Sequence, residues 1–473
     1  MTRAVAGAVA DTARYAQHWL EVQHRLARIP GLQVAIAHDD TLVLSRAYGM
    51  ADVEAGEPLS TRHLFRVASH SKMFTATAVL QLTEAGTLRL DDRADAWLGH
   101  LDGSDLGAAT LRELLGHGAG ISRDSPDGDF WQLLAPFPDA RTLAGRTGPA
   151  SDVGVLATGE RFKYSNLGFG LLGMVIEAAS GLSYAEYVAA HITGPLGLSR
   201  TGTEWDPARA AEFATGYTGL ATASGPGPTR TAIEPIDTRA LAPATGVYST
   251  AEDLVRFAAA HYLGSEALLV DASRRRMQHS EWPTGRDGEE YGLGMIVTTI
   301  GTRRTIGHSG GFPGFLTRTI LDPVDRFAVS VLTNAIDAPA SALAATLVKL
   351  VDLAAEIPAP ADTAHLDRFT GSFANLWGLL DVVRLGGRLY ALDPASPDPT
   401  DHPVHLTVLD DATARIGGGT GYGSYGETFR YSWSDDGSVA SLRADSGQSM
   451  YPADSYRTAL ADRARVTTGP IRP

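Results

Sequence analysis

A serine and a lysine three residues apart offer the clearest chemistry in this sequence, in the run Ser69-His70-Ser71-Lys72. Residues three apart on a helix share a face, so the hydroxyl and the amine are expected to touch. A serine alcohol becomes a good nucleophile only when a neighbouring base takes its proton. A desolvated lysine can act as that base, because burial disfavours its charged form. The spacing therefore predicts Ser69 as nucleophile and Lys72 as its base.

The composition strengthens this interpretation of Lys72. Of the 40 basic residues only three are lysines, Lys72, Lys163 and Lys349. Arginine fills nearly every position where a generic positive charge is enough, but a guanidinium does not lose its proton near neutral pH. With so few lysines, about 0.2 matches to Ser-x-x-Lys are expected by chance. The single match, at Ser69 and Lys72, indicates that this lysine is present because it can lose its proton.

A second group of candidates is Tyr164-Ser165-Asn166, directly before a predicted helix. A cationic lysine nearby is expected to lower the pKa of Tyr164 and allow it to relay a proton. The amide of Asn166 could orient Lys72 or bind a substrate carbonyl. The structural alternative is that Asn166 caps the helix while Tyr164 packs in the core.

The third group is His308-Ser309-Gly310-Gly311, on or beside a predicted strand. Gly310 and Gly311 permit close approach of a substrate backbone. The N–H groups of Gly311 and Ser69 would form an oxyanion hole. His308 would line the pocket and bind substrate or aid proton transfer, although a histidine here is also compatible with a structural role.

With the preceding glycine, the run Gly307-His308-Ser309-Gly310-Gly311 also fits G-x-S-x-G, which would make Ser309 the nucleophile of an α/β-hydrolase. That motif needs a helix after the serine, whereas a β-rich sequence follows here. Two G-x-G-x-x-G runs, at 168–173 and 421–426, are interpreted as tight helix packing and as a loop of a β-domain. Ser69 therefore remains the predicted nucleophile.

Hydrophobic periodicity predicts an α/β (α+β) framework, in which the strands after residue 290 look like one antiparallel sheet closed by a helix. Residues 121–160 lack periodicity, and loops of that length are often functional. Phe130 and Trp131 within them are expected to shape the pocket, as are residues near 220–230. The helices are predicted at 10–29, 69–85, 111–115, 167–179, 250–261 and 338–353, and the strands at 32–37, 41–48, 291–299, 304–307, 315–321 and 327–333.

The pattern changes after a Pro-rich segment, which predicts two domains. Residues 1–355 would form the catalytic domain, 356–364 a linker, and 365–473 a small antiparallel β-domain. In the last part the apolar residues alternate in short runs, which favours a barrel or a sandwich. These runs lie at 380–385, 388–392, 404–409, 428–433 and 438–443.

Composition excludes several other function classes. The net charge of −14 makes nucleic acid and anionic membranes unfavourable partners. The absence of cysteine removes disulfides and Cys-based zinc sites, and the sequence contains neither HExxH nor a P-loop, so neither a metal nor a cofactor is expected. With no apolar span and no secretory h-region at the start, a cytoplasmic location is expected.

Together, in this order, the three groups resemble the β-lactamase-like serine hydrolases, also called the penicillin-binding-protein fold. The Tyr-x-Asn form and the His-x-Gly third motif look most like the class C β-lactamase, esterase and D-aminopeptidase branch, and the similarity spans about residues 15–353. Supporting stretches lie at 114–121, 246–254 and 291–295. The resemblance implies the fold, which is an antiparallel sheet flanked by helices with a helical subdomain. It also implies an acyl-enzyme at Ser69, with Lys72 and Tyr164 as the acid/base pair. Residues 365–473 are similar to lipocalin-like domains appended to some of these peptidases.

The expected activity is therefore hydrolysis of amide or ester bonds in small substrates, such as short peptides or amides with D-residues. His308 replaces the lysine with which β-lactamases begin the third motif, so β-lactam hydrolysis is not the expected task. One alternative is acyl transfer to an amine, including peptide cyclisation. Another is a non-catalytic binding protein that keeps the fold. The oligomeric state is left open, as is contact between the C-terminal domain and the site.

Overall fold

The computed structural model describes residues 2–222, 229–356, 363–418, 424–458 and 460. Its contacts divide the chain into two compact units, one of Ala27–Ala345 and one that joins Met1–Leu26 to Thr346–Pro473. The domain boundaries at 355 and 365 stay a prediction, and most of the linker at 356–364 lies outside the described residues. The segments 223–228 and 421–423 of the predicted loops are likewise not described.

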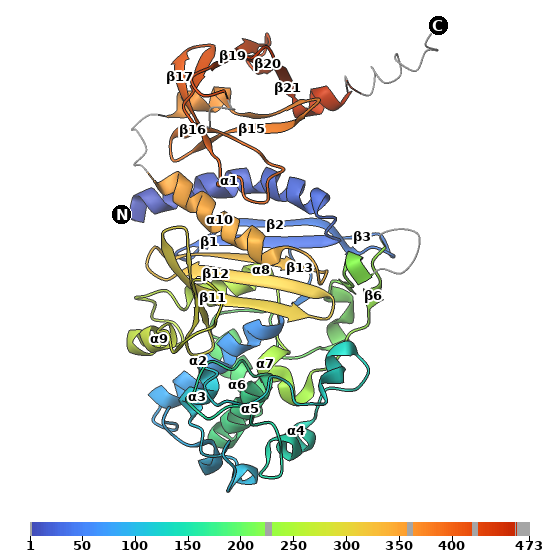
Figure 1. Cartoon of the computed structure of the whole chain (residues 1–473), viewed down its shortest axis with the longest axis vertical. Helices are drawn as coiled ribbons and strands as arrows, with labels where there is room; N and C mark the ends of the chain where they lie inside the picture. Colours follow the sequence, from blue (N-terminus) through green and yellow to red (C-terminus); the bar gives the residue numbers. More distant parts are fainter. Residues whose placement is uncertain (1, 223–228, 357–362, 419–423, 459, 461–473) are drawn as a thin grey trace. The chain divides into compact units, whose positions relative to one another are not determined.

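The unit Ala27–Ala345 is built on a nine-stranded antiparallel sheet (Figure 1). Strand β13 lies inside the sheet, between β1 and β12, and is buried along its whole length, as expected for a strand that is exposed to solvent on neither face. This architecture confirms the antiparallel sheet predicted from the sequence. In sheet order the strands are β3 (Glu57–Pro58), β2 (Thr41–Asp52), β1 (Gly31–His38), β13 (Phe327–Thr333), β12 (Phe315–Asp322), β11 (Arg303–Phe312), β10 (Ile296–Ile300), β9 (Glu289–Tyr291) and β8 (Trp282–Pro283).

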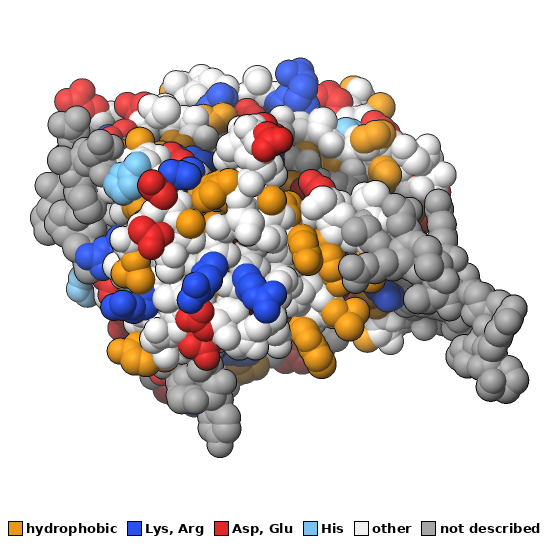
Figure 2. Space-filling view, turned by 90° about the horizontal axis from the view of Figure 1, so that it is seen from above, with side chains coloured by type: hydrophobic (Ala, Val, Ile, Leu, Met, Phe, Trp, Pro, Cys, Tyr) orange, Lys and Arg blue, Asp and Glu red, His pale blue; other side chains and the backbone are white. Residues whose placement is uncertain are grey.

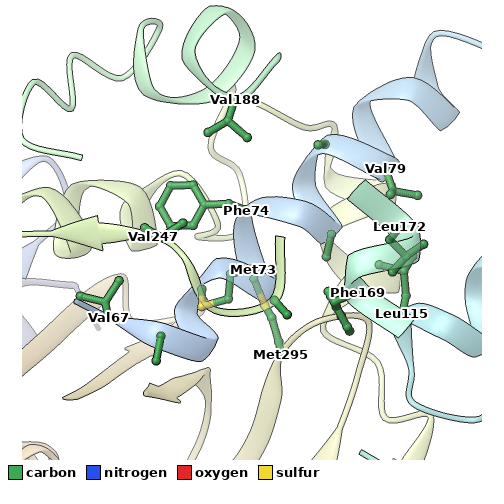
Figure 3. Packing of buried hydrophobic residues seen from close by; sticks show 14 of the residues in the cluster. Val67, Met73, Phe74, Val79, Leu115, Phe169, Leu172, Val188, Val247 and Met295 are labelled. Atoms are coloured by element: carbon green, nitrogen blue, oxygen red, sulfur yellow. The ribbon is translucent and has the colours of Figure 1, made fainter. Parts of the chain in front are cut away.

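Helix α2 (Ser71–Glu84) is the central helix of this unit and is buried on every side over most of its length. Figure 3 shows Met73, Phe74 and Val79 pointing from it into the surrounding apolar core. Phe74 stacks on Phe257 with ring centroids 3.8 Å apart. A helix enclosed in this way cannot shift without disturbing the core, so it is a rigid support for Lys72.

The other helices of the unit surround α2 or cover the sheet. They are α3 (Leu111–Leu115), α4 (Ala140–Thr147), α5 (Asn166–Ser180), α6 (Tyr184–Val188), α7 (Ala242–Thr245), α8 (Ala251–Ala259) and α9 (Asp271–Met277). Two further pairs of short strands are β4 (Phe65–Arg66) with β7 (Tyr248–Ser249) and β5 (Gly216–Tyr217) with β6 (Ala232–Ile233).

Two local predictions have different outcomes. Helix α4 was missed within 121–160, although Asp139 caps it by accepting a hydrogen bond from the Thr142 backbone at 2.8 Å. The run 168–173 lies in α5, where a Cβ on Gly173 would approach Pro243 Cγ to 2.2 Å. Tight helix packing, rather than a phosphate loop, therefore accounts for that glycine.

The second unit contains a closed eight-stranded barrel, which confirms the predicted β-domain. Its interior is apolar, and helix α1 (Thr2–Leu26) packs on the outer side of β15 (Figure 1). Helix α10 (Ala340–Ala355) crosses the division between the units. The barrel strands are β14 (Gly371–Asn375), β15 (Gly378–Leu385), β16 (Arg388–Leu392), β17 (Val404–Asp410), β18 (Thr413–Ile416), β19 (Thr428–Trp433), β20 (Val439–Ala444) and β21 (Ser449–Pro452).

The surface and the helices bear on possible partners. Figure 2 shows a face on which acidic and basic side chains are interspersed, so the net charge of −14 is not gathered into one patch there. Within the described ranges no single helix is long and apolar enough to cross a membrane, and one bent pair, Asn166–Ser180 with Tyr184–Thr193, passes by length and composition only.

Candidate active site

Ser69 lies in the middle of a short 3₁₀ turn, η1 (Ala68–His70), that leads directly into α2. Ala68 adopts a left-handed φ of +48°, a conformation that costs an alanine about 1 kcal/mol. The turn is held by Ser71, whose hydroxyl donates to the Ala68 carbonyl at 2.7 Å and accepts from the Val247 N–H at 2.9 Å. Strain of this kind, fixed by surrounding contacts, is typical of functional positions.

Lys72 is fully buried one helical turn from Ser69, as the spacing predicted. Its Nζ lies 3.2 Å from Ser69 Oγ, 2.7 Å from Asn166 Oδ1 and 2.8 Å from the Ala244 carbonyl oxygen. Burial lowers the pKa of Lys72 well below its usual value, and the charge of Arg123 adds to that effect. A neutral amine has two N–H donors, and the two carbonyl-type acceptors use both. The lone pair is then directed at Ser69.

Tyr164 completes the contacts of the serine, because its O–H donates to Ser69 Oγ at 2.8 Å. Burial raises the pKa of Tyr164 to about 12, against an opposing effect of the hydrogen bond to Ser69. The expectation of a lowered pKa was therefore wrong, since desolvation outweighs the nearby positive charges. Near neutral pH Tyr164 keeps its proton and acts as a donor.

Asn166 is the first residue of α5 and does not cap it. Ser165 is the N-cap, with its hydroxyl accepting from the Gly168 N–H at 3.1 Å. The Asn166 amide is thus available to Lys72, and its Nδ2 donates to Asp124 Oδ1 at 2.6 Å. Asp124 fixes the orientation of the amide so that its oxygen faces Lys72. Sequence reasoning missed Asp124, although it lies in the long irregular segment marked as functional.

His308 lies on β11 and is held between two neighbours. Its Nδ1 donates to the Ser309 carbonyl at 2.7 Å, and its Nε2 accepts from the Tyr291 O–H at 3.0 Å. Burial lowers the pKa of His308 well below its usual value. His308 is therefore a neutral pocket residue whose two ring nitrogens are both engaged.

Gly310 explains how β11 comes close to the nucleophile. A Cβ at this position would lie 2.2 Å from the carbonyl oxygen of Val67, two residues before Ser69. Only glycine allows the strand and the loop to approach to that distance. The next residue, Gly311, then lines the same pocket as Ser69.

The pocket at Ser69 has a volume of about 320 Å³, enough for a small substrate. It brings together Ser69, Tyr164, His308 and Gly311 from the predicted set. Lys72 and Asn166 are buried beside it, with Lys72 at hydrogen-bond distance from Ser69 and Asn166 at hydrogen-bond distance from Lys72. Charged residues that the sequence analysis did not single out also line it, namely Arg123, Arg286 and Glu289.

Two predictions about the pocket's surroundings need correction. Phe130 and Trp131 do not line it but pack together with Phe137. Ser309 does line it, but β11 continues through this residue and is followed by strand β12. The strand–turn–helix geometry of an α/β-hydrolase nucleophile is therefore absent at Ser309.

The described residues contain no group of three or more His, Cys, Asp or Glu side chains able to hold a metal ion. The chemistry available around Ser69 is that of a hydroxyl, an amine and a phenol.

The sequence profile of the Beta-lactamase family matches residues 21–353 of the chain. The chain belongs to the beta-lactamase family. It is a serine hydrolase of that family, with the barrel as an addition outside the matched range. Penicillin-binding protein 4* of Bacillus subtilis is 29% identical over 315 residues, which cover 64% of this chain and 67% of that protein. The chain spans 61% of the length of another curated relative, protein flp of Staphylococcus aureus, at 24% identity over 66% of this chain.

Solved structures show the same fold. The octameric penicillin-binding protein homologue from Pyrococcus abyssi aligns with a TM-score of 0.64 at 22% identity, over 92% of this chain and 99% of its own. The D-amino acid amidase from Ochrobactrum anthropi, complexed with L-phenylalanine amide, aligns with a TM-score of 0.60 at 22% identity, over 72% of this chain and 99% of its own.

Proposed function

We propose that this beta-lactamase family member hydrolyses amide or ester bonds of small substrates through an acyl-enzyme on Ser69. The observation that carries the proposal is the hydrogen-bonding of Lys72. Both N–H groups of its neutral amine have acceptors, Asn166 and the Ala244 carbonyl, so the lone pair is left for the Ser69 hydroxyl. That arrangement is what a general base for a serine nucleophile requires.

In the acylation step, Ser69 Oγ attacks the substrate carbonyl carbon as its proton passes to Lys72 Nζ. The carbonyl oxygen becomes an oxyanion, and the backbone N–H groups of Ser69 and Gly311 would stabilise it. Tyr164 then gives its proton to the leaving amine or alcohol, and Lys72 returns the proton to Tyr164. The products are the released leaving group and an ester on Ser69.

In the deacylation step a water molecule takes the place of the leaving group. Tyr164 passes its proton to Lys72 Nζ and takes a proton from the water as the water oxygen attacks the ester carbonyl. The bond to Ser69 Oγ then breaks, Tyr164 gives its proton to the serine, and Lys72 returns its extra proton to Tyr164. Because burial raises the pKa of Tyr164 to about 12, the phenolate exists only transiently within this step.

The substrate class that we propose is short peptides or amides that contain D-amino acids, or short esters. A pocket of about 320 Å³ supports a small substrate, and its charged lining by Arg123, Arg286 and Glu289 supports a polar one. The structural likeness to a D-amino acid amidase agrees with this class. His308 in place of a lysine argues against β-lactams as substrates. A cytoplasmic location remains part of the proposal.

The test is a panel of p-nitrophenyl esters, D- and L-amino acid amides and nitrocefin, with wild type, Ser69→Ala and Ser309→Ala. We expect Ser69→Ala to abolish turnover of the active substrate and a fluorophosphonate probe to label wild type at Ser69 only. Ser309→Ala is the matched control and should only reduce turnover, because it alters the pocket wall. The reverse pattern would assign the chemistry to Ser309 and overturn the proposal.

Mass spectrometry of the products identifies the acyl acceptor. Hydrolysis leaves a free carboxylate, whereas transfer to an amine leaves a new amide or a cyclic peptide. Products that are mainly amides with an added amine present would contradict hydrolysis as the reaction while leaving the Ser69 acyl-enzyme intact.

A further inference from the structure

A small cavity in the unit that contains the barrel lies between α1 and the outer wall formed by β14 and β15. Its volume is about 210 Å³. From α1 it is lined by Asp11, Arg14, Tyr15 and His18, whose spacing of three, four and seven residues places them on one face of the helix. This face therefore points polar groups at the barrel wall.

Asp381 is the most deeply buried charged group of this cavity, with 2% of its surface exposed. Along β15, Val382 belongs to the apolar core of the barrel, so the alternation of the strand directs Asp381 outward toward α1. Within the described part of the chain, neither carboxylate oxygen of Asp381 has a hydrogen-bond partner, and neither does the hydroxyl of Tyr15. Among the described residues, Asp381 makes one ion-pair contact within 4 Å, with His18 Nε2 at 3.5 Å.

The charges of the cavity do not balance when His18 is neutral. Asp11 pairs with Arg14 at 3.1 Å, and Arg384 pairs with Asp367 at 2.5 Å. Those two carboxylates are thus matched by the two arginines, and Asp381 is the third carboxylate without a permanent cation. A carboxylate buried without compensation is strongly unfavourable. Unsatisfied buried polar groups in a cavity point to a molecule that occupies it.

We propose that this cavity is a binding site for a small organic cation whose primary ammonium group pairs with Asp381. An ammonium carries three donors and no acceptor. Asp381, Tyr15 and Ser372 all line the cavity, and their side-chain oxygens are the acceptors nearest to it, although Ser372 Oγ already lies 3.2 Å from His18 Nε2. The volume is several times that of a water molecule, about 30 Å³, so it admits the carbon skeleton of an amine as well as its charge.

His18 competes with such a ligand. Its close contact with the Asp381 carboxylate raises the pKa of His18 above its usual value, against the opposing effect of burial. Below that pKa the imidazolium neutralises Asp381, and the ligand gains less by binding. Binding is therefore expected to weaken as the pH falls. The other charged or titratable groups that act on the cluster are Asp11, Arg14, Tyr15, Glu21, Arg25, Asp367, Arg384 and Asp393.

Isothermal titration calorimetry on the full chain tests the proposal, with benzylammonium as probe and benzyl alcohol as its neutral counterpart. At about pH 8.5 wild type should bind benzylammonium and not the alcohol, because the amine is mostly protonated there. Asp381→Asn removes the charge at nearly constant shape and should weaken binding by about 30-fold or more. Asp435→Asn, at an exposed aspartate of the same unit, is the matched control and should bind like wild type.

The proposal is overturned if wild type binds the alcohol as well as the amine, binds neither, or if Asp381→Asn keeps wild-type affinity. Should Asp381→Asn fail to fold, the pH series on wild type decides. Affinity for benzylammonium must be lower at about pH 6 than at about pH 8.5. An affinity that is constant or higher at the lower pH would reject the cation site.

Discussion

Two deeply buried ionisable groups in this protein, Lys72 and Asp381, have opposite surroundings. Lys72 has three polar neighbours within 3.2 Å, Ser69, Asn166 and the Ala244 carbonyl. Asp381 has no hydrogen bond from any described residue and one ion-pair contact with His18. A satisfied buried network is rigid and fixes the geometry of its members. An unsatisfied one leaves interaction capacity for a ligand.

The comparison separates two uses of burial. At Lys72, burial changes the protonation of a group whose neighbours are part of the protein, which prepares it for proton transfer. At Asp381, burial excludes water from a carboxylate whose one ion-pair contact among the described residues is with His18. That leaves the carboxylate able to bind a ligand. If this distinction holds, variants at the first site should change rates and their pH dependence, whereas variants at the second should change affinity and stability.

The largest effect is expected for Lys72→Arg. The substitution keeps a positive charge but removes the ability to lose it, so the base for Ser69 is lost. We expect kcat to fall by about 10³- to 10⁴-fold, the upper range for removal of a general base. Steady-state kinetics with the best ester or amide substrate measure it.

Lys349→Arg is the matched control for that variant, because Lys349 pairs with Asp398 and an arginine can keep the pair. It should retain wild-type kcat. A Lys72→Arg protein that folds, as judged by circular dichroism, and keeps more than a tenth of wild-type kcat would contradict Lys72 as the base.

A smaller effect is expected for substitution of Asp124, which holds the Asn166 amide beside Lys72. Asp124→Ala frees the Asn166 amide to rotate, and the loss of a charged hydrogen bond costs about 1.5–3 kcal/mol, or about 10- to 100-fold in kcat. Asp124→Asn keeps an acceptor and should restore much of the rate. Because the charge of Asp124 raises the pKa of Lys72, its removal should move the acid limb of the kcat profile to lower pH.

Arg123→Gln supplies the opposing change. The charge of Arg123 lowers the pKa of Lys72, so its removal should move the acid limb to higher pH. The sign follows from the mechanism, since activity is lost as Lys72 becomes protonated. Shifts in the same direction for Asp124→Asn and Arg123→Gln would show that the acid limb does not report Lys72.

The sequence predicted the residues of the network that carry recognisable spacing. Ser69 and Lys72 follow from helical geometry alone, and the helices and strands that hold them have strong periodicity. Tyr164, Asn166 and His308 were found from their motifs. These cases share a feature, which is that a local run of residues contains the whole signal.

What could not be predicted depends on contacts between distant segments. Asp124 contributes through a hydrogen bond to Asn166, 42 positions away, and no local pattern marks that pair. The pKa of Tyr164 had the wrong predicted sign because burial, which the sequence does not give, outweighs the nearby charges. Asp381 and His18 are 363 positions apart, and α1 was predicted to begin eight residues later than it does.

The smallest effect is expected for His18→Gln, and it is a change in how the free energy of unfolding depends on pH. The folded-state pKa of His18 is raised, so its pairing with Asp381 contributes fully below the unfolded pKa of 6.5 and is lost as the pH rises through the folded value. At about pH 5.5 the free energy of unfolding of the variant should therefore be lower than that of wild type, by less than about 1 kcal/mol for this partly exposed pair. At high pH the two free energies should converge. Urea unfolding at several pH values measures the difference. His402→Gln, at an exposed histidine of the same unit, is the control and should show no such trend. If the stability difference between His18→Gln and wild type instead grows as the pH rises, His18 does not compensate Asp381.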